Sequence, residues 1–177
     1  MKCIIVYQSK TGFTKRYAEW MQKALHCDIK DIKDVTGQML SDYDRIIFGS
    51  YIRIEKVCGW KKFKKRLGED SIQKLVLFAT GSTSVTAVDH INGIWERSML
   101  KEELSVIPHF YMQSGLNYEK MSLGEKLLMK VFAVIMKWKK RREGTKLSQD
   151  ISKSYDHSSK KYIVPLVEYV TKQNTVK

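Results

Sequence analysis

The stretch that most constrains the fold is KCIIVYQSKTGFT, residues 2–14. Residues 3–7 form a short apolar run rich in β-branched residues, which suits a strand buried on both faces. Small and polar residues follow at 9–14, and a helical pattern opens at Lys15. Unpaired amides and the helix dipole favour an anion at a helix N-terminus, so this turn is predicted to bind phosphate. An ordinary strand-to-helix turn with a capping hydroxyl is the alternative.

Other phosphate motifs are missing from the sequence. Neither G-x-G-x-x-G nor G-x-x-x-x-G-K-[ST] occurs, so dinucleotide-binding and Walker-type sites have no support. What occurs instead is S-x-T-G-x-T, directly after the first predicted strand. This pattern favours a site in which uncharged hydroxyls and backbone amides hold a phosphate without a metal.

Composition limits the class of protein. A chain of 177 residues with 43% hydrophobic content and two prolines suits one ordered domain with a sizeable core. The three cysteines, Cys3, Cys27 and Cys58, are odd in number and lack C-x-x-C spacing, which is typical of reduced thiols rather than of a disulfide framework or a zinc site. Because the first predicted strand begins at Lys2, no signal peptide is expected. We therefore expect a cytoplasmic protein, either free or peripheral on the inner face of a membrane, with no metal site.

Along the chain, apolar strands alternate with helical patterns. Strands are predicted at 27–32, 43–50, 74–80 and 106–112, the last irregular or at an edge because of Pro108. Helices are predicted at 14–26, 59–67, 92–104 and 158–171. This alternation predicts an α/β fold with a parallel sheet and helices on both faces. The segments 9–14, 49–53 and 80–84 are all small or hydroxyl-rich and follow apolar strands, so we expect them to converge at one edge of the sheet.

Three segments give the chain a family resemblance. They are S-K-T-G-F-T at 9–14, Y-D-R-I-I-F-G-S-Y-I-R at 43–53, and a basic-hydrophobic excursion at about 115–146 followed by a closing helix. On these, the chain resembles the flavodoxin superfamily, and within it the menaquinone-dependent protoporphyrinogen oxidase group. The resemblance implies a doubly wound parallel five-stranded sheet of order 2-1-3-4-5, one domain over residues 1–177, and non-covalently bound FMN.

The resemblance also implies which residues bind FMN. The phosphate would be held by Ser9, Lys10, Thr11, Gly12, Phe13 and Thr14. One side of the isoalloxazine ring would be lined by Ser50, Tyr51, Ile52 and Arg53, and the other by Thr80, Gly81 and Ser82. Flavodoxins usually place a tyrosine in the loop after the third buried strand, but residues 81–93 contain no aromatic, so Tyr118 is the candidate substitute.

The charge of the chain bears on the flavin potential. The net charge is +13, whereas electron-carrier flavodoxins are acidic. Reduced flavin carries negative charge near N1, so a nearby cation such as Arg53 favours the reduced state. We predict a less reducing flavin than in acidic flavodoxins. The alternative is that Arg53 points into solvent.

The excursion forms the second unusual feature. On a helix through 119–142, Glu119, Lys126, Lys130 and Lys137 share one stripe, and apolar residues cover most of the rest. Such a helix is too short and too rich in lysine to span a bilayer. One interpretation is peripheral docking of residues 126–142 on an anionic membrane or a hydrophobic partner. The other is packing on the chain's own domain or in a dimer interface.

The sequence leaves several functions open. We expect an FMN-binding redox protein that exchanges electrons with a protein, quinone, membrane or tetrapyrrole-type partner, as an electron carrier or an FMN-dependent oxidoreductase. A menaquinone-dependent protoporphyrinogen oxidase is the first alternative, and a non-catalytic binding module that keeps the fold is the second. No catalytic residue is assigned. Nucleic acid is not an expected partner, because the basic clusters lack interleaved aromatic residues and a recognisable module.

Overall fold

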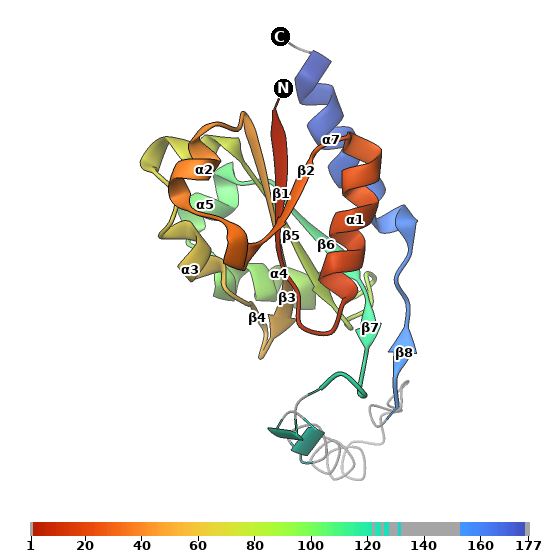
Figure 1. Cartoon of the computed structure of the whole chain (residues 1–177). Helices are drawn as coiled ribbons and strands as arrows, with labels where there is room; N and C mark the ends of the chain where they lie inside the picture. Colours follow the sequence, from red (N-terminus) through yellow and green to blue (C-terminus); the bar gives the residue numbers. More distant parts are fainter. Residues whose placement is uncertain (1, 122, 125, 128–130, 132–152, 176–177) are drawn as a thin grey trace.

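The computed structural model describes residues 2–121, 123, 124, 126, 127, 131 and 153–175. Its main sheet has five parallel strands in the order β2-β1-β3-β5-β6 (Figure 1). These strands are β1 Cys3–Gln8, β2 Asp28–Asp31, β3 Arg45–Arg53, β5 Leu75–Gly81 and β6 His109–Gln113. The two-residue strand β4, Lys56–Val57, folds back antiparallel on β3 and lies outside this row. Without β4 in the count, the order is the predicted 2-1-3-4-5, and the fold prediction is confirmed.

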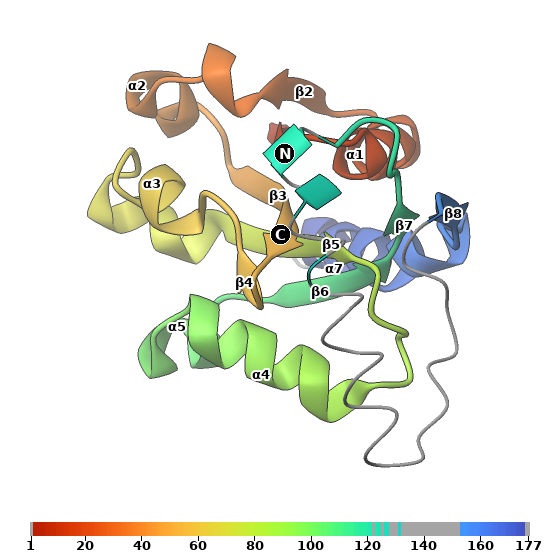
Figure 2. The same cartoon turned by 90° about the horizontal axis from the view of Figure 1, so that it is seen from below.

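Helices cover both faces of the sheet (Figure 2). One face packs against α1 Phe13–Leu25, the 3-10 helix η3 Lys160–Ile163 and α7 Val164–Thr175. The other packs against α2 Gly37–Ser41, α3 Trp60–Lys64, α4 Val88–Ser98 and α5 Lys101–Val106, with the 3-10 helices η1 Ile32–Asp34 and η2 Glu69–Lys74 in the connections. The neighbouring strands β1 and β3 are both buried on their two faces. Because of this, each has a continuous apolar run rather than alternating apolar and polar residues.

The predicted elements differ from the structure mainly at their ends. The helix predicted at 92–104 is two helices, because the backbone is extended at Met99 and Leu100. The Glu103 carboxylate accepts the amide N–H of Leu100 at 2.8 Å, which starts α5 as a separate helix. Since α5 runs to Val106, the predicted strand 106–112 begins only at His109.

Other boundaries shift in the same way. The helix predicted at 59–67 is the shorter α3 followed by a turn, and the one predicted at 158–171 starts as η3 and continues to Thr175. The strand predicted at 43–50 runs on to Arg53, where β3 turns into β4. The short helices η1 and α2 had no counterpart in the sequence prediction.

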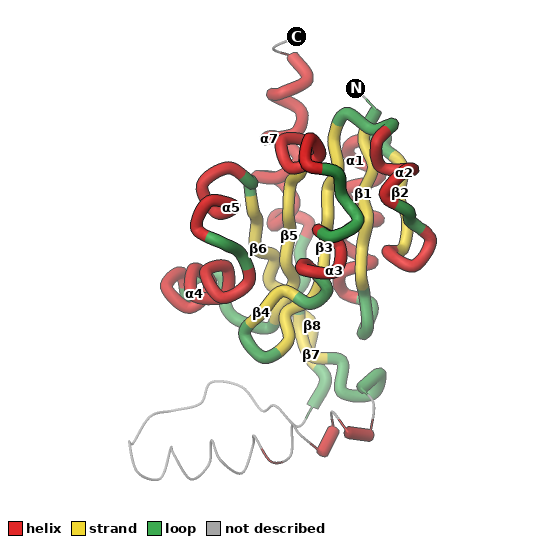
Figure 3. The backbone as a smooth tube through the Cα atoms, turned by 90° about the vertical axis from the view of Figure 1, so that its left-hand side faces the viewer, coloured by secondary structure: helices red, strands yellow, loops and turns green. Residues whose placement is uncertain are grey.

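A second, two-stranded sheet marks where the excursion leaves and rejoins the fold (Figures 1 and 3). Its strands are β7 Gly115–Leu116 and β8 Tyr155–Asp156, paired antiparallel. A Cβ on Gly115 would lie 1.9 Å from the Tyr155 carbonyl oxygen, so this close pairing requires glycine. We call residues 117–154 the insertion.

Most of the insertion, including most of the predicted helix 119–142 and of the docking segment 126–142, lies outside the described residues. Of its described side chains, Leu123 and Leu127 are 85% and 64% exposed. Within the part of the chain that the structure describes, no helix is long and apolar enough to cross a bilayer.

Candidate functional site

The three loops predicted to converge do begin at one edge of the sheet. In the parallel register, Gln8 at the end of β1 pairs with Ser50 of β3, and Tyr51 pairs with Thr80 of β5. The segments that start at Ser9, Ser50 and Thr80 therefore lie on three adjacent strands, at their carboxyl ends. We call this the strand-end site; it is the edge that faces the viewer in Figure 2. In open α/β sheets, ligands bind at this edge.

The turn between β1 and α1 has the backbone that an anion site needs. Gly12 occupies the position before α1 with φ 99°, a left-handed conformation that glycine adopts without steric cost. Because Gly12 has no side chain, no capping side-chain bond is made there, and the alternative of a turn capped by its own hydroxyl is not what the structure has. By helix geometry the first amides of α1 have no acceptor within the helix, which is the arrangement that binds anions at helix N-termini.

Hydroxyl groups are buried at all three strand ends, with Thr80 on the face of the sheet that α1 covers and Ser50 on the opposite face. Thr14 Oγ1 and Thr80 Oγ1 lie 2.8 Å apart and share a hydrogen bond, with the two side chains 1% and 2% exposed. The hydroxyl oxygens of Ser9 and Ser50 are also buried, and neither has a hydrogen-bond partner among the described residues. A buried hydroxyl without a partner costs about 1–3 kcal/mol. These two oxygens are therefore suited to a polar ligand.

The start of the insertion lies against residues 9–14, which we call the phosphate loop after the ligand predicted for it. Asn117 Nδ2 donates to the Thr11 carbonyl oxygen at 3.5 Å, and Asn117 Oδ1 accepts the amide of Lys120 at 3.2 Å. The Lys120 ammonium is 3.9 Å from the position that a Cβ on Gly12 would occupy. The insertion thus brings a cation to the predicted phosphate site. Sequence reasoning missed Asn117 and Lys120, because no local spacing signals a contact across more than a hundred residues.

Tyr118 belongs to the same turn. Its amide donates to Ser154 Oγ at 2.9 Å, which joins the two ends of the insertion. The Lys126 ammonium lies 5.7 Å from the centre of the Tyr118 ring. The stacking of Tyr118 on a flavin stays a prediction.

The loop after β5 is fastened by side chains of β6. The Tyr111 hydroxyl donates to the Thr83 carbonyl oxygen at 2.7 Å, and Gln113 Oε1 accepts the amide of Val85 at 3.2 Å. A Cβ on Gly81 would lie 3.0 Å from the Tyr111 hydroxyl oxygen. Burial raises the pKa of Tyr111, so its hydroxyl stays protonated and donates at neutral pH. Tyr111 is an aromatic residue beside this loop that sequence reasoning missed.

A basic pocket of about 290 Å³ adjoins the phosphate loop. Three predicted site residues, Ser9, Lys10 and Tyr51, line it together with Gln8, Asp31, Ile32, Lys33, Lys62 and Arg66. Four of these side chains are cationic and one is anionic, so the pocket favours an anion. Arg66 is held in place because its Nη1 donates to the carbonyl oxygens of Ile32 and Val35, at 2.6 and 3.1 Å.

Two other cations near the strand ends, Arg16 and Arg53, do not line this pocket. Arg16, in the first turn of α1, donates to the carboxylate of Asp156 and, at 2.9 Å, to Ser158 Oγ, so its charge is paired with the strand that closes the insertion. Arg53 is exposed at the β3–β4 hairpin. Of the remaining predicted residues, Ile52 is half-buried and Ser82 is exposed at the same edge, and Phe13 is buried at the start of α1.

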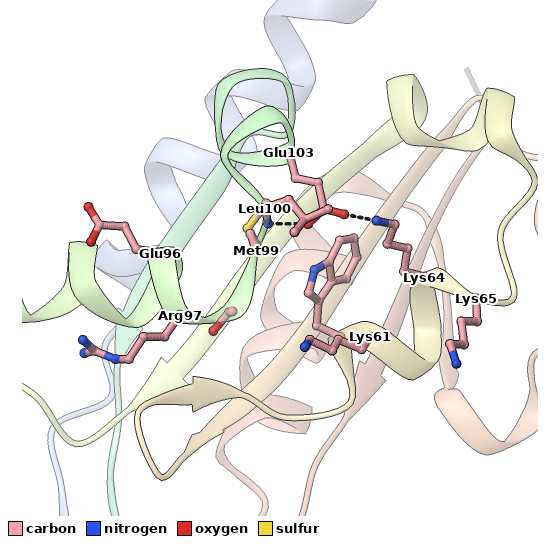
Figure 4. A pocket seen from close by; sticks show the side chains of 10 residues that line it. Lys61, Lys64, Lys65, Glu96, Arg97, Met99, Leu100 and Glu103 are labelled. Carbon is pink, nitrogen blue, oxygen red and sulfur yellow. Dashed lines mark hydrogen bonds and ion pairs between the residues drawn. The ribbon is translucent and has the colours of Figure 1, made fainter.

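A larger pocket of about 480 Å³ lies between α3 and the junction of α4 with α5, and includes no predicted site residue (Figure 4). Its wall contains Glu103, which is 7% exposed and accepts from the Lys64 ammonium and the Leu100 amide. Burial raises the pKa of Glu103, but hydrogen bonds from Lys64 and Leu100 outweigh it and hold that pKa below its ordinary value. This network fastens α5 to α3, which is a structural role.

A family model and several solved structures are similar to this chain. The family model described as flavodoxin domain matches residues 4–145. Oxidised flavodoxin 2 from Bacillus cereus is 19% identical over 64% of this chain and 84% of its own, with a TM-score of 0.47. Two-electron reduced Megasphaera elsdenii flavodoxin is 20% identical over 63% of this chain and 82% of its own, with a TM-score of 0.44.

One curated relative is similar over a shorter stretch. Protoporphyrinogen IX dehydrogenase [quinone] of Leishmania major is 33% identical over 58 residues, which are 29% of this chain and 25% of the relative. The match therefore spans about a quarter of that relative's length. The family model, by contrast, includes the five parallel strands, apart from Cys3 at the start of β1, and the three loops of the strand-end site. On that match, the chain belongs to the flavodoxin domain family.

Proposed function

We propose that this protein binds FMN at the strand-end site and transfers electrons through it. The observation that supports this best is the set of buried hydroxyls on three adjacent strand ends. Ser9 and Ser50 have no hydrogen-bond partner among the described residues, and the bonded pair of Thr14 and Thr80 retains one hydroxyl hydrogen to donate elsewhere. A phosphate ester and a polar ring edge would satisfy these groups.

Each part of the site has a distinct role in the proposal. The phosphate is held by residues 9–14 through amides and hydroxyls, and Lys120 adds a positive charge from the insertion. The ring lies between residues 50–53 and residues 80–82, with Tyr118 as the candidate stacking residue. Bound FMN supplies the electron-transfer chemistry. The chain itself supplies binding, orientation and a positive environment, and Arg53 is the cationic residue among those predicted to line the ring.

Titration of the flavin-free protein with FMN and with riboflavin tests the cofactor. We expect FMN to bind and riboflavin to bind at least about tenfold more weakly, because the phosphate contacts are then lost. Lys120→Met should weaken FMN binding several-fold and leave riboflavin binding unchanged. Lys172→Met is the matched control, since Lys172 is an exposed lysine on α7. A protein that binds neither flavin would instead support the non-catalytic module.

The redox partner is the finer part of the proposal. The Leishmania major match favours, as a second candidate, a quinone-dependent oxidation of protoporphyrinogen IX. Steady-state assay with protoporphyrinogen IX and menaquinone, each omitted in turn, distinguishes the two. Turnover that requires both compounds supports the oxidase. Fast reduction by a flavodoxin reductase without such turnover supports an electron carrier.

We also propose a peripheral membrane contact through residues 126–142, at the cytoplasmic face. Its support is the basic-apolar sequence together with the exposed Leu123 and Leu127 just before and within this segment. Sedimentation with vesicles tests it: binding to vesicles with anionic lipid, weakened by salt, is expected. Equal recovery in the supernatant with anionic and neutral vesicles would contradict it.

A further inference from the structure

Two cysteines and an arginine form a row at the edge of the sheet opposite the strand-end site. In the parallel register, Ile4 of β1 pairs with Asp28 of β2, so Cys3 and Cys27 are the neighbouring pair one residue earlier. On its other side Cys3 pairs with Arg45, the first residue of β3. The two thiols share the core cluster beneath α1 and α7, so they project from the same face. The row therefore runs Cys27, Cys3, Arg45 across three strands.

This placement meets the Cα-distance requirement of a disulfide. Adjacent strands lie about 4.8 Å apart, which falls within the range of about 4.4–6.8 Å for the Cα atoms of bonded cysteines. Both side chains line one cavity and project from the same face of the sheet, so the two sulfur atoms lie near each other. Both cysteines are free thiols in this structure. Bond formation would thus need little backbone movement.

The two thiols differ in access. Cys3 is 8% exposed, whereas Cys27 is half-buried and lies between the end of α1 and the start of β2. A cavity of about 160 Å³, open to solvent, is lined by both cysteines with His26 and Val170. A small oxidant therefore reaches Cys27 first, and Cys3 lies directly behind it.

The surroundings also differ in charge. The hydrogen bond from Cys3 lowers the pKa of Cys27, against the opposing effects of burial and of Asp28. The same bond and burial raise the pKa of Cys3, while Arg45 lowers it. The Arg45 Nε is buried and has no hydrogen-bond partner among the described residues, although the other end of the guanidinium donates to Gln173 of α7. A fixed, incompletely satisfied cation therefore stands beside Cys3 when that sulfur must give up its proton.

We propose that Cys27 and Cys3 form a peroxide-reactive dithiol, with Cys27 as the attacking sulfur and Cys3 as the resolving one. The Cys27 thiolate attacks one oxygen of hydrogen peroxide, the O–O bond breaks, and the hydroxide released takes up a proton to become water. The Cys3 sulfur then attacks the sulfur of the Cys27 sulfenic acid. The S–S bond forms, the S–O bond breaks, and the Cys3 proton leaves with the hydroxyl as a second water. Two thiols are oxidised by two electrons and one peroxide is reduced to two waters, so the step balances.

This inference does not depend on FMN, because the row lies at the amino ends of β1 and β2. The full-length protein, reduced and freed of reductant, is treated with hydrogen peroxide and analysed by intact mass and by peptide mapping without reduction. We expect the mass of two hydrogens to be lost and a Cys3–Cys27 cross-linked peptide to appear. Cys58→Ser is the matched control and should behave as wild type, because Cys58 lies near the other end of the sheet and its sulfur accepts a hydrogen bond from Gln8.

Two variants assign the roles. Cys27→Ser, a change at a half-buried position, should abolish the mass loss while leaving the circular dichroism spectrum unchanged. Cys3→Ser should stop the reaction at a sulfenic acid on Cys27, which dimedone traps. The proposal is overturned if the cross-link is absent in wild type, if it joins two chains, or if dimedone labels Cys58 as fast as Cys27.

Discussion

The hydrogen bond between Thr14 and Thr80 gives the sharpest test of how the strand-end site is built. The two hydroxyl oxygens are 2.8 Å apart, and both side chains are almost completely buried. Replacing either threonine with valine removes one hydroxyl and leaves the other buried without this partner, which costs about 1–3 kcal/mol of the free energy of unfolding. Replacing both leaves two apolar groups of the same shape, which is close to neutral. We therefore expect the double variant to be more stable than either single variant.

Denaturant unfolding of the flavin-free protein measures this, with the midpoint compared at unchanged slope. Because the double variant is close to neutral, the coupling energy from the four proteins equals the sum of the two single losses, about 2–6 kcal/mol. The chain offers a matched control in Ser84 and Thr86, whose hydroxyl oxygens are also 2.8 Å apart but exposed. Ser84→Ala and Thr86→Val should each change stability by less than about 0.5 kcal/mol. If the losses at Thr14 and Thr80 simply add, the two hydroxyls are not coupled and the geometry argued above is wrong.

The same variants separate stability from binding. If the Thr14 hydroxyl contacts the FMN phosphate as proposed, the double variant regains stability but still binds FMN about tenfold more weakly, a loss of about 1.4 kcal/mol. The affinity for riboflavin should change much less, because riboflavin has no phosphate. Equal FMN affinity in wild type and the double variant would remove Thr14 from the phosphate site without touching the stability argument.

Three further substitutions have expected outcomes in the same unfolding assay. Gly49→Ala should lower the free energy of unfolding by about 1–3 kcal/mol, because the new Cβ would lie 1.8 Å from Phe78 Cζ. Gly68→Ala is the control and should not lower it, because no atom lies within 4 Å of the new Cβ. Equal effects of the two substitutions would contradict this packing. Ile54→Asn should gain about 1 kcal/mol, because Ile54 is 77% exposed and holds a left-handed φ of 48° that asparagine tolerates better; an unchanged or lower midpoint would count against strain there. Asp156→Asn tests pH dependence. Burial raises the pKa of Asp156, but hydrogen bonds from Ser158 and from the guanidinium on α1 outweigh it and lower this pKa overall. The contribution of Asp156 to the free energy of unfolding is therefore present above the unfolded pKa of about 3.9 and is lost as pH falls through the lower folded value. The substitution should therefore cost less than about 1 kcal/mol at pH 7 and progressively less below pH 4, and a difference independent of pH would refute it.

The central strands and their loops could be predicted because each is indicated by residues that are consecutive in the sequence. Residues 3–7, 46–48 and 75–79 are consecutive apolar runs, and burial on both faces of a parallel sheet produces that pattern. The turn at 9–14 follows the first run directly, so its position in the fold follows from its position in the chain. The same logic placed Ser50 and Thr80 at neighbouring strand ends, as the register confirms.

What sequence reasoning missed depends on contacts between distant residues or on backbone conformations that the residue types do not favour. The β3–β4 hairpin turns through Ile54 and Glu55, both with positive φ, where asparagine or glycine would have signalled the turn. The pairing of Cys3 with Cys27 appears only when β1 and β2 are in register. Lys120 comes near Gly12, more than a hundred residues earlier in the chain, from the insertion, which leaves the sheet at Gly115 beside its own return strand.

The contacts at the phosphate loop also relate the insertion to whatever binds there. Asn117 and Lys120 approach the loop from the start of the insertion, and Arg16 of α1 is paired with Asp156 where the insertion ends. Both ends of the insertion are thus held by residues within or next to the loop between β1 and α1. A ligand that binds this loop more tightly when these contacts are made favours the same contacts at both ends of the insertion, and linkage is reciprocal. A partner that engages the insertion should therefore change the affinity for the ligand by the same factor, so the insertion and the phosphate loop are best regarded as one functional unit.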